Sequence, residues 1–188
     1  SVTALPATVM AEWGRIDVLF NNAIFRGVGT LDRITDLTIE SMTNLLAGNF
    51  MNQIVLIQQV IPHMLAAGGG TIIDMVSGSA RLDPAGPPGE GGWGILYSAS
   101  KAAFGRVAGG VNAEYRAQGI KAFNVDPGNV VTEARKAAKP DDEYSTGYGS
   151  EPAEATGKVV AWLASDPNAE KFLGKWIFAP KHCSKHGL

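Results

Sequence analysis

Short apolar runs alternate with helical patterns along most of this chain of 188 residues. The apolar runs have the length and β-branched content of buried strands, and they cover residues 16–20, 71–76, 120–125 and 175–178. Helical patterns stand before or between them at residues 3–13, 38–65, 97–118 and 152–164. Strands joined through helices pair in parallel and are covered on both faces. The sequence therefore predicts an α/β fold with a doubly wound parallel sheet.

Composition narrows the class of protein. Hydrophobic residues make up 45% and charged residues 18%, which is typical of a folded globular chain. The net charge of -2, without a long basic run, argues against nucleic acid as a partner. Apolar runs are too short for a membrane span, and the first residues lack a signal-peptide layout. The single Cys183 excludes an internal disulfide, so we expect a cytoplasmic protein.

Tyr97 and Lys101 stand four residues apart at the start of an alanine- and glycine-rich helical pattern. Residues at this spacing share one helix face. A cation one turn away favours the phenolate form of a tyrosine, so such a pair can exchange a proton with a carbonyl or alcohol oxygen. The same spacing also occurs by chance on half-exposed helices. The pair alone is therefore weak evidence for catalysis, and the interpretation depends on the neighbouring motifs.

Polar or turn residues follow three of the predicted strands. They are Asn21-Asn22-Ala23, Ser77, and the segment from Pro127-Gly128 to Thr132. In open parallel sheets ligands bind beyond the carboxyl ends of the strands. We expect these three segments to face one crevice.

Five motifs in the same order resemble the short-chain dehydrogenase/reductase family, in its single-domain form. They are residues 14–23 with their Asn-Asn-Ala, Asn49 in the long helix, Ser77 at a strand end, Tyr97 to Ala103, and Pro127 to Thr132. The resemblance implies a Rossmann-like fold, with residues 1–188 as a single, incomplete dinucleotide-binding oxidoreductase domain. It implies an NAD- or NADP-dependent enzyme that transfers a hydride between nicotinamide and a secondary alcohol or ketone.

The resemblance also implies roles for individual residues. Tyr97 is the general acid or base, Lys101 favours its phenolate and holds the ribose of the cofactor, and Ser77 donates a hydrogen bond to the substrate oxygen. Asn49 holds a water that links Lys101 to solvent. Ser79 competes with Ser77, and Asn44 and Asn52 fit the spacing of Asn49 less well. The expected cofactor contacts are Asn22, Ala23, Tyr97, Lys101, Pro127, Gly128, Val130 and Thr132.

Three features depart from the family pattern. Residue 1 falls inside the helix before the family's fourth strand, so the glycine-rich phosphate loop and the residue that selects NAD or NADP are missing from this sequence. Ile24 replaces a glycine, and a β-branched residue does not easily adopt positive φ. The loop at residues 83–94 is longer than usual, and Trp93 within it is an expected substrate contact, with Ser79. Residues 133–150 are a second loop expected near the substrate site.

Other functions stay open at this point. They are a catalytically silent binding or scaffold protein of the same fold, an inactive fragment, and an epimerase or dehydratase that shares the Tyr-x-x-x-Lys pair. Family members are usually homodimers or homotetramers, and we expect the same here. His182, Cys183 and His186 offer three potential ligands in a terminal tail, and we expect no metal site.

Overall fold

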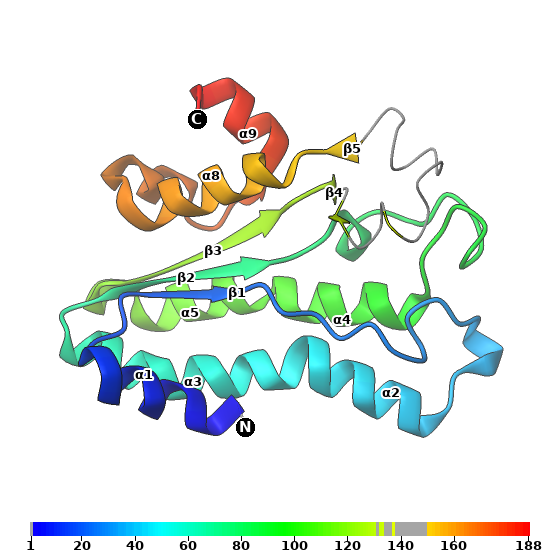
Figure 1. Ribbon diagram of the computed structural model, residues 1–188, viewed down its shortest axis with the longest axis horizontal. Helices are drawn as coiled ribbons and strands as arrows, with labels where there is room; N and C mark the ends of the chain where they lie inside the picture. Colours follow the sequence, from blue (N-terminus) through cyan, green and yellow to red (C-terminus); the bar gives the residue numbers. More distant parts are fainter. Residues whose placement is uncertain (1, 131, 134–136, 138–149) are drawn as a thin grey trace.

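A computed structural model describes residues 2–130, 132–133, 137 and 150–188. Within these residues the main sheet has four parallel strands in the order β1-β2-β3-β6 (Figure 1). Their bounds are β1 (Val18–Asn21), β2 (Gly70–Met75), β3 (Ile120–Asp126) and β6 (Trp176–Phe178). The register pairs Asp74 with Asn21 on one side and with Asn124 on the other. The predicted α/β fold with a parallel sheet is confirmed.

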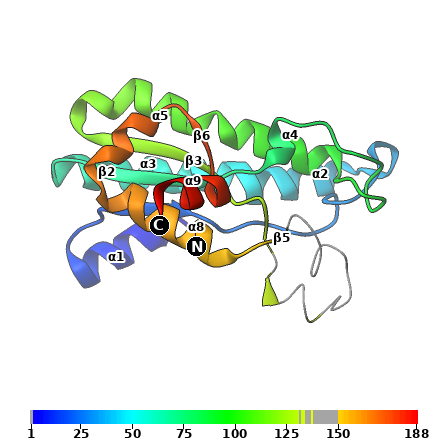
Figure 2. The same cartoon turned by 90° about the horizontal axis from the view of Figure 1, so that it is seen from above.

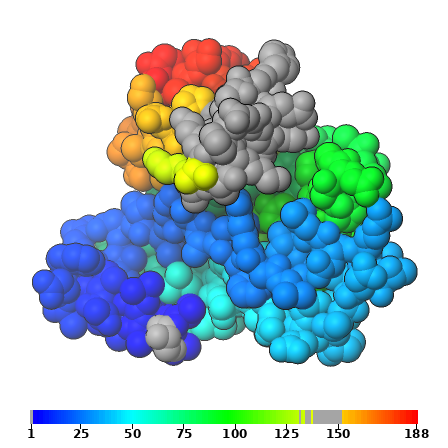
Figure 3. Space-filling model, turned by 45° about the vertical axis from the view of Figure 1, so that its right-hand side comes forward, coloured from blue at the N-terminus to red at the C-terminus, as the bar shows by residue number. Residues whose placement is uncertain are grey.

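Helices cover both faces of the sheet (Figures 1 and 2). One face carries α1 (Leu5–Trp13), α2 (Ile39–Leu46), α3 (Asn52–Ala66), α4 (Ile95–Gly105) and α5 (Val107–Tyr115), and the other carries α8 (Ala153–Ser165) and α9 (Ala179–His186). Successive residues of β2 serve the two layers, because strand side chains alternate between faces. Ile72 joins the core under α3 and α5, whereas Ile73 joins the core under α8. Figure 3 shows the segments coloured orange and red gathered on the opposite side from the blue N-terminal segment.

Short elements complete the chain. The 3-10 turns are η1 (Val2–Ala4), η2 (Ile34–Asp36), η4 (Gly78–Ala80), η5 (Arg116–Gln118) and η6 (Pro167–Phe172). Two further strands, β4 (Asn129–Val130) and β5 (Ser150–Glu151), pair in parallel within a region expected to be loop. No helix of the described residues is both long and apolar enough to cross a bilayer.

The long helix expected at residues 38–65 has Thr38 as its N-cap. Thr38 Oγ1 accepts a hydrogen bond from Ser41 N, and Ser41 Oγ accepts one from Thr38 N, each at 3.0 Å. This reciprocal pair is a capping box. A π-helical segment, η3 (Ala47–Met51), interrupts the helix and contains Asn49, which the sequence pattern did not predict.

The apolar run at 16–20 taken alone predicts a buried strand, but without the family's first strands it is expected at an exposed edge of the sheet. β1 is such an edge strand of the described sheet, and Val18 and Phe20 are 41% and 38% exposed. Two other predictions need correction. The helix expected at 97–118 begins at Ile95 and breaks at Arg106. The C-terminal tail forms α9, because His182 packs on Trp162 and Phe172 with ring centroids 4.9 and 4.7 Å apart.

Gly69, between α3 and β2, gives a test of this packing. Its φ is +138°, and an added Cβ would lie 2.6 Å from the carbonyl oxygen of Gly119. We expect Gly69→Ala to lower the free energy of unfolding by about 2 kcal/mol, measured by urea denaturation. Gly110→Ala is the control, since nothing lies within 4 Å of its added Cβ on α5. This control should stabilise by up to about 1 kcal/mol, and equal effects of both variants would contradict the close approach.

Candidate active site

Helix α4 carries Tyr97 and Lys101 on consecutive turns, and it packs against both η3 and η4. Asn49 lies within η3, and Ser77 is the residue that caps η4 directly after β2. Tyr97 is partly exposed, whereas Lys101 is 5% exposed. The fold therefore brings the segments of all four predicted catalytic residues to the carboxyl end of β2.

The Lys101 ammonium is held beneath that strand end. Lys101 Nζ donates a hydrogen bond of 2.8 Å to the carbonyl oxygen of Met75. Burial lowers the pKa of Lys101 to about 8, Asp74 and Asp126 oppose this shift, and Arg26 adds to it. The group is thus poised to lose or hold its charge near neutral pH.

Ser77 and Ser79 form one hydroxyl pair. Ser79 N and Ser79 Oγ both donate to Ser77 Oγ, at 3.3 and 3.1 Å. Both bonds use the Ser77 oxygen as acceptor, so its hydroxyl hydrogen stays available to a substrate oxygen. Ser79 is 5% exposed and its hydroxyl hydrogen is engaged. This geometry favours Ser77 as the donor and gives Ser79 a supporting position.

The Asn49 amide holds the loop after β1. Asn49 Oδ1 accepts from Phe25 N at 2.7 Å, and Asn49 Nδ2 donates to Phe25 O at 3.2 Å. Gln53, one turn further on, donates to the carbonyl oxygen of Ala23 at 3.3 Å. The side chain of Asn49 thus fixes the backbone next to the expected cofactor contacts, a task that the sequence did not reveal. Its proposed water relay stays a prediction.

The expected cofactor contacts occupy the ends of β1 and β3. Asn22 and Ala23 are exposed directly after β1, and Pro127 and Gly128 are half-buried after β3. Gly128 has φ of +72°, and its N–H donates to Asp126 Oδ1 at 3.0 Å, which shapes an open turn. Val130 is half-buried in β4 and Thr132 is exposed. These segments lie beyond the carboxyl ends of parallel strands, where ligands bind in open sheets of this kind, and their contact with a cofactor stays a prediction.

Ile24 does not strain this backbone. No described residue other than glycine has a positive φ, so Ile24 adopts an ordinary conformation. The concern raised by its β-branched side chain therefore does not apply to the backbone.

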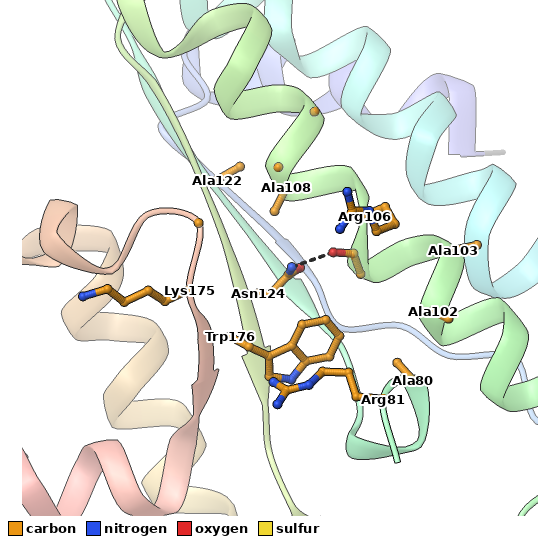
Figure 4. Close-up of a pocket in the computed structure, with 14 residues that line it drawn as sticks. Ala80, Arg81, Ala102, Ala103, Arg106, Ala108, Ala122, Asn124, Lys175 and Trp176 are labelled. Atoms are coloured by element: carbon orange, nitrogen blue, oxygen red, sulfur yellow. Dashed lines mark hydrogen bonds between the residues drawn. The ribbon is translucent and has the colours of Figure 1, made fainter. Parts of the chain in front are cut away.

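The loop at residues 83–94 covers a cavity of about 780 Å³. Trp93 and Ser79 line it, together with Ile95, Ser98 and other residues. Its lining omits Tyr97 and Lys101, because it lies against a different face of α4. A second cavity, of about 610 Å³, lies between α5 and β6, where Arg81 stacks over Trp176 (Figure 4). The other expected loop, residues 133–150, lies almost wholly outside the described residues.

The C-terminal histidines serve packing. His182 and His186 stack with centroids 4.3 Å apart, and burial lowers the pKa of His182. Across the described part of the chain, no group of three His, Cys, Asp or Glu side chains is placed to hold a metal ion.

Relatives and solved structures resemble this chain. The protein named D-threitol dehydrogenase from Mycolicibacterium smegmatis is 34% identical over 135 residues, which cover 71% of this chain and 47% of that protein. Dehydrogenase/reductase SDR family member 6 from Xenopus laevis is 31% identical over 174 residues, 84% of this chain and 65% of that protein. This chain thus spans about half the length of the first of these curated relatives.

A solved structure shows the same fold. The gluconate 5-dehydrogenase from Burkholderia cenocepacia, crystallised with NADP and tartrate, superposes with a TM-score of 0.79 at 24% identity, over 98% of this chain and 71% of that one. The family described as short chain dehydrogenase matches residues 1–143. The chain therefore belongs to the short-chain dehydrogenase family of oxidoreductases.

Proposed function

We propose that this protein is an NAD- or NADP-dependent oxidoreductase that interconverts a secondary alcohol and a ketone, with Tyr97 as the general acid or base. The observation that carries the proposal is the burial of Lys101 one helical turn from Tyr97, at a strand end that also presents Ser77. Burial penalises the charge of an ammonium, so a lysine kept in such a place is a candidate for a functional role. The name of the relative D-threitol dehydrogenase supports an alcohol as substrate.

The residues divide the work of proton transfer. Tyr97 gives a proton to the carbonyl oxygen in reduction and takes it back in oxidation. In the proposal, Lys101 places a positive charge one helical turn from Tyr97. The Ser77 hydroxyl donates to the same oxygen and stabilises the negative charge that develops there. The nicotinamide, when bound, supplies or accepts the hydride.

In the proposal, residues that follow the strand ends bind the cofactor. Asn22 and Ala23 after β1 and the turn from Pro127 to Gly128 after β3 would contact the cofactor, and Asn49 keeps the first of these segments in place through Phe25. Lys101 holds the ribose hydroxyls in the proposal, and Val130 and Thr132 complete the contacts. Trp93 lines a cavity on another face of α4 than Tyr97, so its expected contact with the substrate stays a prediction.

Replacing the proposed acid tests the mechanism. We expect Tyr97→Phe to lower kcat by at least about 100-fold, because no group then exchanges the proton. The assay is nicotinamide absorbance in the complete protein, with a series of secondary alcohols and ketones and both cofactors. Tyr115→Phe on α5 is the matched control and should keep full activity. Turnover that survives in Tyr97→Phe, with an unchanged melting temperature, would overturn the assigned role.

The serine pair gives a second test. We expect Ser77→Ala to lower kcat by about 100-fold or more, since a preorganised donor to the reacting oxygen is lost. Ser79→Ala removes a supporting bond and should cost much less. If Ser79→Ala were the more damaging substitution, Ser79 rather than Ser77 would be the donor. Circular dichroism of both variants checks that the fold is retained.

A further inference from the structure

A row of three polar side chains crosses three strands of the sheet near their carboxyl ends. Asn21 on β1, Asp74 on β2 and Asn124 on β3 stand in register. They share the face that carries α4, since the adjacent Ile73 and Phe123 belong to the core on the opposite face. Asp74 is fully buried, and Asn21 is 6% exposed.

Two hydrogen bonds tie the ends of this row. Asn21 Nδ2 donates to Asp74 Oδ1 at 2.8 Å. Asn124 Nδ2 donates to the carbonyl oxygen of Gly105 on α4 at 2.7 Å, the bond drawn in Figure 4. Two buried oxygens remain without a partner, Asp74 Oδ2 and Asn124 Oδ1. They belong to residues that are directly paired across neighbouring strands and that share one face of the sheet, so the two side chains extend side by side.

Two acceptors cannot satisfy each other without a hydrogen between them. Turning the Asn124 amide over offers no remedy, because its oxygen would then face the Gly105 carbonyl oxygen, which is also an acceptor. A proton on Asp74 Oδ2 satisfies both atoms at once. Leaving them unpaired in a buried site is costly.

We propose that Asp74 carries a proton that it donates to Asn124 Oδ1, and that the release of this proton makes Asp74 a positioning residue that keeps Lys101 charged. The first half stands on the sheet alone, and the second half rests on the proposed function. Asp74 is adjacent in sequence to Met75, whose carbonyl oxygen accepts the hydrogen bond from Lys101 Nζ.

The electrostatics agree with this arrangement. Burial raises the pKa of Asp74 to about 7, against smaller lowering effects from Asn21 and Lys101. Asp74 in turn raises the pKa of Lys101, as Asp126 does, whereas burial and Arg26 lower it to about 8. As pH rises, Asp74 therefore ionises first, and the charge left behind holds the Lys101 proton. The charge on Lys101 in turn acts on Tyr97, which lies one helical turn away on α4.

The free energy of unfolding should depend on pH through the same two groups, Asp74 and Lys101. The unfolded chain releases the Asp74 proton near its ordinary pKa of 3.8, whereas the folded protein keeps it to about pH 7. The folded state then binds more protons, so stability falls as pH rises between those values. Above about pH 8 the unfolded chain binds the Lys101 proton that the folded protein has released, so stability rises again toward 10.5.

The test follows the Asp74 carboxyl carbon by NMR in the complete protein as pH is varied. We expect a titration midpoint near pH 7, and a midpoint near the ordinary ~4 would overturn the proposal. Asn124→Ala should move the midpoint down, because the acceptor of the proton is lost. Glu114→Gln, an exposed carboxyl on α5, should leave it unchanged.

Asp74→Asn mimics the protonated form and keeps the row of hydrogen bonds. We expect the Lys101 titration to move down by about one pH unit, and the alkaline limit of kcat with it. An unmoved Lys101 titration in this variant would overturn the positioning role. Absence of turnover in the unaltered protein would instead contradict the proposed function, while both NMR titrations would still decide the proton and its coupling.

Discussion

The bond from Lys101 Nζ to the Met75 carbonyl oxygen is the contact around which the site is arranged. It ties α4 to the last residue of β2 and removes an ammonium from solvent. Because α4 also packs against η3 and η4, this anchor fixes three segments that are distant in sequence. Moving the ammonium would leave a buried charge or an unpaired carbonyl, so the helix has one favourable position on the sheet.

Polar residues inside the sheet extend this anchor sideways. The row from Asn21 through Asp74 and Asn124 to Gly105 spans three strands and returns to α4, the helix that carries Tyr97 and Lys101. A slip by one residue would turn these side chains to the other face, and hydrogen bonds between side chains tolerate little change in geometry. The row therefore specifies how strands and helix are aligned, while the two apolar cores supply most of the driving force.

Local patterns were sufficient to predict the order of strands and helices and the shared face of Tyr97 and Lys101. Features that depend on distant partners were not predictable. The bonds between the Asn49 amide and the backbone of Phe25 depend on the loop after β1, which no local pattern places beside Asn49. The pairing of Asp74 with Asn124 requires the strand register, which periodicity does not give. Helix α9 was missed because its histidines gain their packing from Trp162 and Phe172, which lie earlier in the chain.

The π-helical segment η3 has a geometric consequence for the helix that contains it. An α-helix turns by about 100° per residue, so one extra residue in a turn rotates everything beyond it by roughly a quarter of a circle. Before the segment, α2 packs on α4, and after it, α3 packs on the sheet. The segment thus rotates the apolar face of α3 relative to the apolar face of α2. Deleting one residue there would remove this rotation and turn one of the two faces toward water.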